Sequence, residues 1–501
     1  MFEATIWSLL PPVIAIALAL ITKEVFSSLF IGILAGGLMF ANFNPVKTID
    51  AVVNEGVIAA VSDTAGIFVF LVVLGVMVAL INKSGGSAAF GRWAETHVKT
   101  KVGAALATFA LGILIFIDDY FNCLTVGSVM RPVTDAHKIS RVKLAYLIDA
   151  TAAPICMIAP ISSWAAAVSE YVADGQGLTY FIKAIPYNFY SLLTLVFIIT
   201  ITVIGFDFGK MSEYEIKAQQ GDIVGDTSNL SKSEKLEVNE KGIVFDLIFP
   251  IIVLIITCVT ALLYVGGFFP GGDYTWDLIG AFGNTDATVG LPMGSLVALV
   301  VTIIYLLLRR VVTFKKAMEA IPQGFIAMVP AILILTLATA LKNMTGLLDA
   351  SSYVKGILAN AGALEYFLPV IVFLVACFLA FSTGTSWGTF GILIPIVSEA
   401  IGLDSELGVI AMSACLAGSV FGDHCSPISD TTIMSSAGAE CNHIAHVSTQ
   451  IPYASTVAAV SAVSYIIAGF VRNALIVLPI AIVLMFATIF TLKVVTAKKA
   501  K

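Results

Sequence analysis

Residues 116–127 read FIDDYFNCLTVG, and the loops on either side of this stretch decide the fold. Residues 83–101 before it and residues 131–143 after it are both rich in Lys and Arg, which is typical of loops on the cytoplasmic side of a membrane. The segment 102–130 between them must then enter and leave the membrane on the same side. We therefore predict a re-entrant hairpin with its tip near Asp118–Asn122.

The composition of the chain is that of a polytopic membrane protein. Of its 501 residues, 58% are hydrophobic and 12% are charged, whereas a soluble domain has about 25% charged residues. Met1–Glu3 has no basic residue, so we expect the first apolar run to be a retained span and not a signal peptide. Apolar stretches long enough to cross a membrane are predicted at residues 8–22, 25–42, 57–82, 144–168, 181–206, 243–266, 291–308, 319–342, 409–435, 451–470 and 474–492.

The two halves of the chain resemble each other, which predicts an internal duplication. ALINKSG at 79–85 parallels ALKNMTG at 340–346, and FIDDYFNCLTVG parallels FSTGTSWGTFG at 381–391. Equivalent loops have opposite charge, since 131–143 is basic and 396–408 has only acidic charges. We therefore predict that the repeats are inverted in the membrane. By symmetry, 363–395 is a second hairpin with its tip near Ser382–Trp387.

The predicted fold class is an all-α polytopic membrane protein with about eleven transmembrane helices and two re-entrant hairpins, arranged as two inverted repeats. Loop charge places the N-terminus outside and the C-terminus in the cytoplasm. The predicted segments are an N-terminal span (1–24), a first repeat (25–206) with hairpin 102–130, a polar cytoplasmic linker (207–242), a connecting span with an external loop (243–290), a second repeat (291–470) with hairpin 363–395, and a C-terminal span with a basic tail (471–501).

Asp118 and Asp119 form a carboxylate pair in an otherwise apolar segment. One carboxylate at mid-membrane costs about 2.5–3.5 kcal/mol, so a pair without a function would be disfavoured. We predict that Asp118, Asp119 and Asn122 bind an ion or substrate at the hairpin tip. The alternative is a short exposed loop between two spans.

A second candidate group lies in the sequence IDATAAP at 148–154. Pro154 within a span breaks the helix and frees a backbone carbonyl. With the Asp149 carboxylate and the Thr151 hydroxyl, that carbonyl would form a set of hard oxygen donors, which suits a hard cation such as sodium. The alternative is a helix kink in which Asp149 is simply hydrogen-bonded.

The second hairpin tip reads STGTSWGT at 382–389. Glycine allows the backbone to approach a ligand closely, and the hydroxyls supply neutral oxygens. We predict binding roles for Thr383, Thr385 and Ser386. The alternative is helix packing, which also uses small residues.

The most polar stretch expected inside the membrane is GDHCSPISDTT at 422–432. It combines two carboxylates, a histidine, several hydroxyls and a helix-breaking proline. The candidate binding residues in it are Asp423, His424, Ser426, Asp430 and Thr431.

A zinc site is an alternative for this region, but its spacing matches none of the common zinc patterns. Its ligands would be His424, Cys425, Cys441, His443 and His446. We expect His443 and His446 to lie at the membrane interface instead.

Three stretches of the sequence resemble the NhaC family of sodium/proton antiporters, in the wider ion transporter superfamily. They are FIDDYFNCLTVGSVMRPVTD, IDATAAPICMIAPISSW and GDHCSPISDTTIMSS. The resemblance implies sodium efflux coupled to proton entry in a bacterial inner (plasma) membrane. It also implies two inverted repeats with paired hairpins, and a homodimer whose transport domain moves like an elevator. Some proteins similar to this family exchange organic acids, and others carry amino acids.

We predict a secondary active transporter that exchanges Na+ for H+ across the cytoplasmic membrane. Asp149 and Asp423 are the hypothesised Na+ ligands. A carboxylate that binds either a sodium ion or a proton, but not both, couples the two flows by competition. The main alternative is a Na+- or H+-coupled carrier or exchanger of a small organic anion or amino acid, which would bind at the hairpin tips.

Other function classes fit the sequence less well. An enzyme is not expected, because no nucleophile or metal constellation has the required spacing. A channel is disfavoured by the scattered carboxylates and the lack of a repeated filter-like segment. We expect no cofactor besides the transported Na+ and H+, and no nucleic-acid partner; the lipid bilayer is the expected surrounding.

Overall fold

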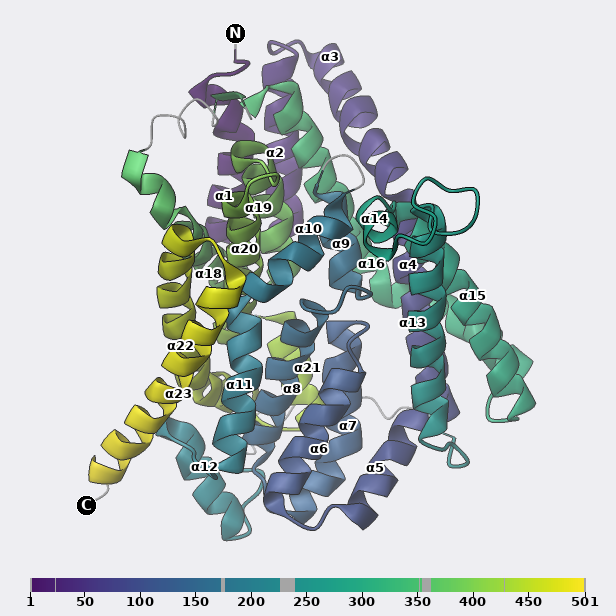
Figure 1. Cartoon of the computed structure of the whole chain (residues 1–501), viewed down its shortest axis with the longest axis vertical. Coiled ribbons are helices and arrows are strands. Elements are labelled where there is room, and N and C mark those ends of the chain that lie inside the picture. Colours follow the sequence, from purple (N-terminus) through teal and green to yellow (C-terminus); the bar gives the residue numbers. More distant parts are fainter. Residues whose placement is uncertain are drawn as a thin grey trace.

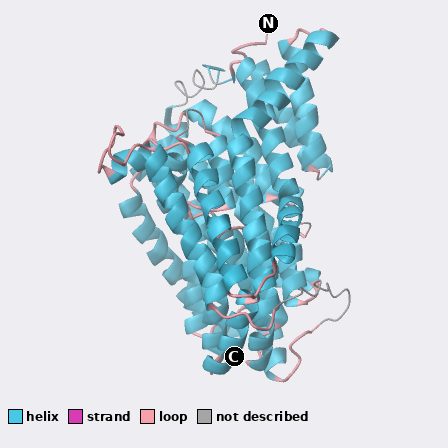
Figure 2. Cartoon of the chain, turned by 90° about the vertical axis from the view of Figure 1, so that its right-hand side faces the viewer, coloured by secondary structure: helices cyan, strands magenta, loops and turns pink. Residues whose placement is uncertain are grey.

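The computed structural model describes residues 2–22, 24–172, 176–225, 239–350, 352–353, 362–427 and 429–499. Every regular element within these residues is a helix (Figure 2), which confirms the predicted all-α class. The N-terminus and the C-terminus lie at opposite ends of the molecule, at the top and the bottom of Figure 1.

The helices of the first half extend from the N-terminus to the polar segment near residue 220. They are η1 (Ile6–Leu9), α1 (Leu10–Thr22), α2 (Val25–Phe40), α3 (Pro45–Asp50), the π-helical η2 (Ala51–Ile58), α4 (Ala59–Ser84), α5 (Gly86–His97), α6 (Lys101–Leu114), α7 (Asp119–Ala136), α8 (Arg141–Cys156), α9 (Ser163–Glu170), α10 (Gly177–Ala184), η3 (Ile185–Tyr187), α11 (Phe189–Val203) and α12 (Gly209–Gln219).

The helices of the second half follow after residue 244. They are α13 (Phe245–Val265), α14 (Leu278–Gly283), α15 (Ala287–Leu308), α16 (Phe314–Leu347), η4 (Gly362–Phe367), α18 (Leu368–Thr383), α19 (Ser386–Ile401), α20 (Glu406–Cys425), α21 (Asp430–Ala439), α22 (His443–Val471) and α23 (Ala474–Lys499).

Seven helices among the described residues are long and apolar enough to cross a membrane, and up to nine are if each of two bent pairs counts as one span. This number is below the predicted eleven, partly because predicted span 144–168 is divided between α8 and α9, and because the apolar helices within 8–22 and 25–42 are short. Predicted span 409–435 is among the seven, but its helix ends at Cys425, just before Pro427. Proline has no backbone N–H and cannot continue a helix hydrogen-bond ladder.

Three helices that pack against one another, α8, α21 and α22, begin at side-chain caps. Ser140, Ser429 and Asn442 precede α8, α21 and α22, and the side chain of each accepts a hydrogen bond from a backbone N–H in the first turn. Such caps satisfy donors that a helix start leaves unpaired. They therefore fix where each of these three helices begins.

Two helix pairs are interrupted at the predicted hairpin tips. Residues 115–118 separate α6 from α7, and Gly384 and Thr385 separate α18 from α19. Gly384 has φ +69°, a left-handed conformation that glycine adopts without strain. In Figure 1, α6 and α7 rise from the lower end, and α18 and α19 lie above them. Re-entry of each pair on one side of the membrane and the inverted repeats stay predictions.

Part of the predicted polar linker (207–242) is helical. The helix α12 packs against α8 and α22. Residues 226–238 lie outside the described residues. The division of the chain into domains therefore stays a prediction.

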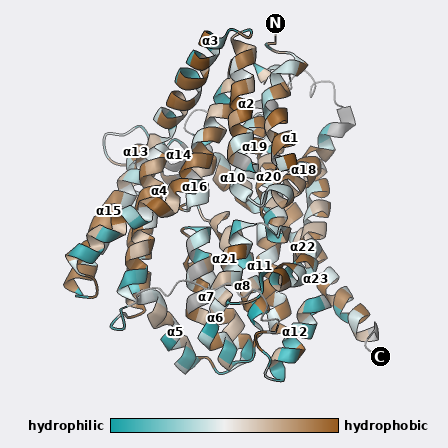
Figure 3. Ribbon diagram, turned by 180° about the vertical axis from the view of Figure 1, so that it is seen from behind, coloured by the Kyte–Doolittle hydropathy of each residue, from teal (hydrophilic) through white to brown (hydrophobic). Residues whose placement is uncertain are grey.

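The outer helices expose apolar side chains. Ile256 of α13 and Val300, Ile304 and Leu308 of α15 are all more than half exposed. Figure 3 shows hydrophobic residues along these helices, while hydrophilic residues gather at the lower end around α5 and α12. This distribution is the one expected of a helix bundle surrounded by lipid.

The helices α4 and α16 cross at two glycines. A Cβ atom added at Gly75 would lie 2.4 Å from the Gly324 carbonyl oxygen, and one added at Gly324 would lie 2.2 Å from the Val76 nitrogen. Small residues allow membrane helices to approach this closely. The crossing therefore depends on both glycines.

We predict that Gly75→Ala and Gly324→Ala each destabilise the protein by about 1–3 kcal/mol, because the added methyl group meets backbone atoms that cannot rotate away. Thermal unfolding of the purified protein, followed by size-exclusion chromatography, measures the change. Val69→Leu and Ile326→Leu are matched controls, since both side chains are exposed on the same two helices. Glycine variants that melt like the wild type would contradict the close crossing.

Candidate functional site

Two adjacent threonines at the start of α21 connect two buried carboxylates. Thr431 Oγ1 donates to Asp423 Oδ2 at 2.9 Å, and Thr432 Oγ1 donates to Asp149 Oδ2 at 3.0 Å. Asp423 belongs to α20 and Asp149 to α8, so the first turn of α21 joins two helices that are far apart in the sequence. The N-cap Ser429 fixes this turn by accepting a hydrogen bond from the Thr432 nitrogen at 3.2 Å.

Asp149 is fully buried, and its Oδ2 atom carries most of its contacts. Besides Thr432, Gln450 Nε2 donates to it at 2.6 Å, and His446 Nε2 lies 3.4 Å away. The other oxygen, Oδ1, has no hydrogen-bond partner among the described residues. The protein therefore holds this carboxylate through Oδ2, while Oδ1 accepts no hydrogen bond from the described residues.

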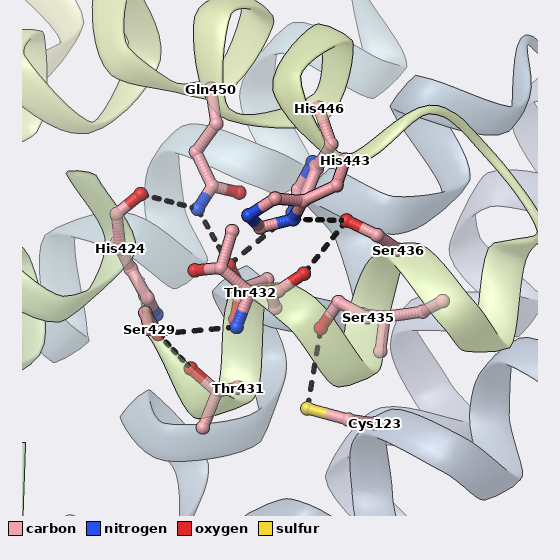
Figure 4. A network of polar contacts seen from close by, with 12 residues as sticks. Cys123, His424, Ser429, Thr431, Thr432, Ser435, Ser436, His443, His446 and Gln450 are labelled. Atoms are coloured by element: carbon pink, nitrogen blue, oxygen red, sulfur yellow. Dashed lines mark hydrogen bonds and ion pairs between the residues drawn. The ribbon is translucent and has the colours of Figure 1, made fainter. Parts of the chain in front are cut away.

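Gln450 connects α22 to both of these acidic helices. Its Nε2 atom also donates to the backbone oxygen of His424, at 2.7 Å, beside Asp423 at the end of α20. Figure 4 shows Gln450, His446 and Thr432 gathered at the centre of this polar network. Four helices, α8, α20, α21 and α22, therefore meet at one group of side chains.

Asp423 resembles Asp149 in being bound by a threonine through Oδ2, while its Oδ1 stays without a partner among the described residues. It is 2% exposed, Thr431 binds its Oδ2, and its Oδ1 has no hydrogen-bond partner in the described part of the chain. The neighbouring His424 is buried, with Nδ1 at 3.0 Å from the Tyr190 hydroxyl and Nε2 without a hydrogen bond in the same part. The site thus contains two half-occupied carboxylates and an imidazole nitrogen.

The first hairpin tip lies inside the protein. Asp118 is 1% exposed and Asp119 is fully buried, which excludes the exposed loop considered above. Asn122 Nδ2 donates to the carbonyls of Gly112 and Ile115 at 2.7 and 2.9 Å, so it closes the end of α6 from across the break. No described residue gives a hydrogen bond to either carboxylate oxygen of Asp119.

The first turn of α7 brings these acids close to the other two carboxylates. The Cys123 thiol is within electrostatic range of Asp149. The Tyr120 hydroxyl is within range of the carboxylates of Asp118, Asp119, Asp423 and Asp430. Acidic residues that we predicted from three separate stretches therefore surround one helix turn.

The hydroxyls of the second hairpin tip serve the backbone around them. Thr383 Oγ1 donates to the Leu379 carbonyl, and Thr385 caps α19 by accepting from the Gly388 nitrogen. Ser386 Oγ donates to the Ser419 carbonyl of α20 at 3.3 Å. These contacts match the packing alternative, and within the described residues none of these hydroxyls hydrogen-bonds to Asp149 or Asp423.

The helix α9 joins the two hairpin tips. The Ser163 nitrogen donates to the Ile117 carbonyl of the first tip at 2.9 Å. The next residue, Trp164, makes an edge-to-face contact with Trp387 of the second tip, with ring centroids 5.8 Å apart. Both indoles are almost fully buried.

Three further predicted residues lie at the margin of the site. Thr151 Oγ1 donates to the carbonyls of Leu147 and Ile148 and packs against Gly112 of α6. Ser426 is buried, and its nitrogen donates to the Asp423 carbonyl at 2.9 Å. Asp430 is exposed at the first position of α21.

Two details of the region differ from expectation. Pro154 does not end α8, which continues to Cys156. The interfacial position expected for His446 is wrong, because it is fully buried beside Asp149, whereas His443 is partly exposed and contacts Ser436 and the Pro427 carbonyl.

Gln450 is not among the residues predicted from the sequence, and it lies one residue before a predicted span. His446 and Gln450 are four residues apart and therefore lie on the same face of α22. That spacing was the one signal in the sequence that could have drawn attention to them. Across the described ranges, no three or more His, Cys, Asp or Glu side chains form a group that could hold a metal ion.

Comparison with known proteins gives a match to the model of the Na+/H+ antiporter family over residues 166–470. A protein of Haemophilus influenzae, described as uncharacterized, is 37% identical over 95% of this chain and 93% of its own length. An uncharacterized Na+/H+ antiporter of the same organism is 44% identical over 16% of this chain and 18% of its own length. The malate-2H+/Na+-lactate antiporter of Bacillus subtilis is 31% identical over 32% of this chain and 34% of its own length.

The family match covers more than half of the chain, and the first relative matches it almost from end to end. Proteins of this family are transporters and not enzymes. The long apolar helices make this chain a multi-pass membrane protein. The chain belongs to the Na+/H+ antiporter family.

Proposed function

We propose that this protein is a secondary active transporter that exchanges Na+ for H+, with Asp149 and Asp423 as the groups that bind the ions. One observation carries the proposal. Two buried carboxylates are each held through Oδ2 by adjacent threonines of α21, and each has an Oδ1 atom without a hydrogen-bond partner in the described residues.

The contacts of these carboxylates suit a cation that comes and goes. Neither Asp149 nor Asp423 pairs with Lys or Arg within the described ranges. Neutral donors therefore orient each carboxylate without cancelling its charge. Sodium is a hard cation that prefers oxygen ligands, and a proton competes for the same carboxylate oxygens. Competition at one site couples the two flows without any resident cofactor.

The charge distribution supports an orientation in the membrane. Arg141 and Lys143 lie beside the segment of chain around α12, since the Arg141 backbone nitrogen donates to the Ile223 carbonyl and Lys143 pairs with Asp207. Arg131 pairs with Glu440, as Arg141 does, and Arg309 follows α15. The helix α12 and the C-terminus lie at the same end of the molecule (Figure 1). By the positive-inside rule we assign this end to the cytoplasm and the N-terminus to the outside. The proposal also places the protein in a bacterial plasma membrane and in the NhaC subfamily. It includes a homodimer whose subunits each have about eleven spans in inverted repeats.

A second candidate is the exchange of a small organic anion. It is favoured by His424, whose Nε2 has no hydrogen-bond partner among the described residues, and by the buried His446 beside Asp149. A protonated imidazole could hold an organic carboxylate by a charge-assisted hydrogen bond. The Bacillus subtilis relative exchanges malate and lactate, according to its name.

Proteoliposomes with a trapped pH dye separate the two candidates. With an imposed pH gradient, we expect sodium alone to cause a proton flux, since the carboxylates need no organic partner to bind a cation. A response that requires an added organic acid or amino acid would replace the first candidate with the second. Empty liposomes are the control for passive leakage.

Asp149→Asn and Asp423→Asn should each abolish sodium-dependent proton flux, because an amide neither carries the charge nor takes up the proton. The amount of protein in the membrane should stay unchanged. Asp273→Asn, the same chemical change at an exposed loop residue, is the control. Full exchange in either site variant would remove that residue from the mechanism.

Thr431→Val and Thr432→Val should each raise the sodium concentration for half-maximal exchange about tenfold, because a hydrogen bond to a charged group contributes about 1.5–3 kcal/mol. The serine variants at the same positions keep the hydroxyl and should stay close to the wild type. Initial rates of dye response across a sodium titration provide the comparison. If valine and serine behave alike at both positions, the hydroxyls do not orient the carboxylates.

A further inference from the structure

A series of buried residues leads from Asp149 along α8 to the basic end of the molecule. Tyr146, Lys143 and Ser140 follow at intervals of three residues, so each lies about one helix turn below the one before. Their exposed fractions are 2%, 4% and 1%. Each of them contacts α22 or the segment 204–219, which we call the strap.

The first layer below Asp149 is aromatic. Tyr146 makes an edge-to-face contact with Tyr453, with ring centroids 5.0 Å apart. Tyr146 lies three residues before Asp149 on α8, and Tyr453 lies three residues after Gln450 on α22, so α8 and α22 stay in contact from the Asp149–Gln450 hydrogen bond to this layer. Phe197 and Phe208 also pack on the Tyr453 ring, at 5.4 and 4.6 Å.

The second layer is charged, although little of it is exposed: the side chains of Lys143 and Asp207 are 6% and 13% exposed. Lys143 Nζ lies 2.7 Å from both carboxylate oxygens of Asp207, and the Tyr453 hydroxyl donates to Asp207 Oδ1 at 2.7 Å. Asp207 belongs to the strap, between α11 and α12. A single carboxylate of the strap therefore holds α8 and α22 together below the ion site.

The third layer fastens α12 to the ends of two other helices. Glu215 Oε1 accepts hydrogen bonds from the Ser140 nitrogen at 2.8 Å and from its hydroxyl at 2.6 Å. Glu215 Oε2 pairs with Lys101 Nζ at 2.5 Å. Ser140 is the N-cap of α8, and Lys101 is the first residue of α6. The strap thus spans the lower ends of α6, α8 and α22.

We propose that the strap is a gate, which closes the route between Asp149 and the basic end of the molecule, and that Asp207 is its latch. A permanent seal could be built from apolar residues alone, because a buried ion pair is on balance no more stabilising than good apolar packing. Lys143 and Asp207 can instead separate and become hydrated when the layers part. The inference rests on the proposed function, since it takes Asp149 as the ion site.

The test measures whether the layers control access to the site. Cys123 is a native reporter, because it is fully buried on the far side of the layers, with Sγ 3.3 Å from Ser435 Oγ. A small membrane-impermeant maleimide is added to inside-out bacterial membrane vesicles that contain the full-length protein. Mass spectrometry then follows modification of the peptide that contains Cys123.

We expect Asp207→Asn to speed the modification of Cys123 about tenfold or more. Loss of one charge-assisted contact raises the population of the open gate by about this factor. Tyr453→Phe removes one hydrogen bond to the latch and keeps the ring, so it should act in the same direction without disturbing the aromatic layer. Glu365→Gln, which breaks the ion pair with Arg472 outside the strap, should label like the wild type.

Two results would overturn the proposal. One is an unchanged rate in both Asp207→Asn and Tyr453→Phe when each elutes and melts as a folded protein. The other is an equal increase in right-side-out vesicles, which would indicate general loosening. Labelling of Cys123 does not require transport, so it tests the gate separately from the ion site. If Asp207→Asn speeds labelling while Asp149→Asn still exchanges at the full rate, only the proposed ion site is contradicted.

Discussion

A carboxylate that is shut away from water must receive its hydrogen bonds from the protein, and Asp149 imposes this constraint on the centre of the molecule. Its donors come from α21 and α22, because no nearby residue of its own helix supplies them. Several helix boundaries follow from this need. Pro427 ends the ladder of α20, Ser429 starts α21 immediately afterwards, and the first turn of α21 then faces both acidic helices.

The short helix α21 separates the two acids while keeping them in one network. Because Thr431 and Thr432 are adjacent, they point in different directions and bind different carboxylates. Any shift of α21 therefore changes the surroundings of Asp149 and Asp423 together. Two sites coupled in this way can respond to one ion as a unit, and no long path of interactions is needed between them.

Much of the architecture could be predicted from the sequence. Long apolar runs predicted a helical membrane protein, and the breaks between α6 and α7 and between α18 and α19 fall at the polar stretches that we took as hairpin tips. The acids of two such stretches, 116–127 and 422–432, surround Tyr120, and Asp149 of a third lies near Cys123 on the next turn, as their cost in an apolar segment suggested. Hydropathy could not predict the divided spans, because Pro427 interrupts a run whose average composition remains apolar.

The rest of the site could not be predicted because it depends on contacts between distant segments. Gln450 has no local signal of function, and its role follows from Asp149, 301 residues away in the sequence. The hydroxyls of Thr383 and Ser386 gave the opposite problem. Their composition suggested a binding site, but in the structure both donate to backbone carbonyls: Thr383 to that of Leu379 within its own helix, and Ser386 to that of Ser419 on α20.

The helix built from α3, η2 and α4 extends over 40 residues, from Pro45 to Ser84. At 1.5 Å per residue such a rod is about 60 Å long, twice the thickness of the hydrocarbon core. Val46 and Ile49 near its upper end are exposed apolar side chains, at 77% and 65%. A thick bilayer, or one that curves upward around the rod, would cover them. Lipid composition therefore becomes part of the energetics of this protein, because a thin membrane would leave this end of the rod in water.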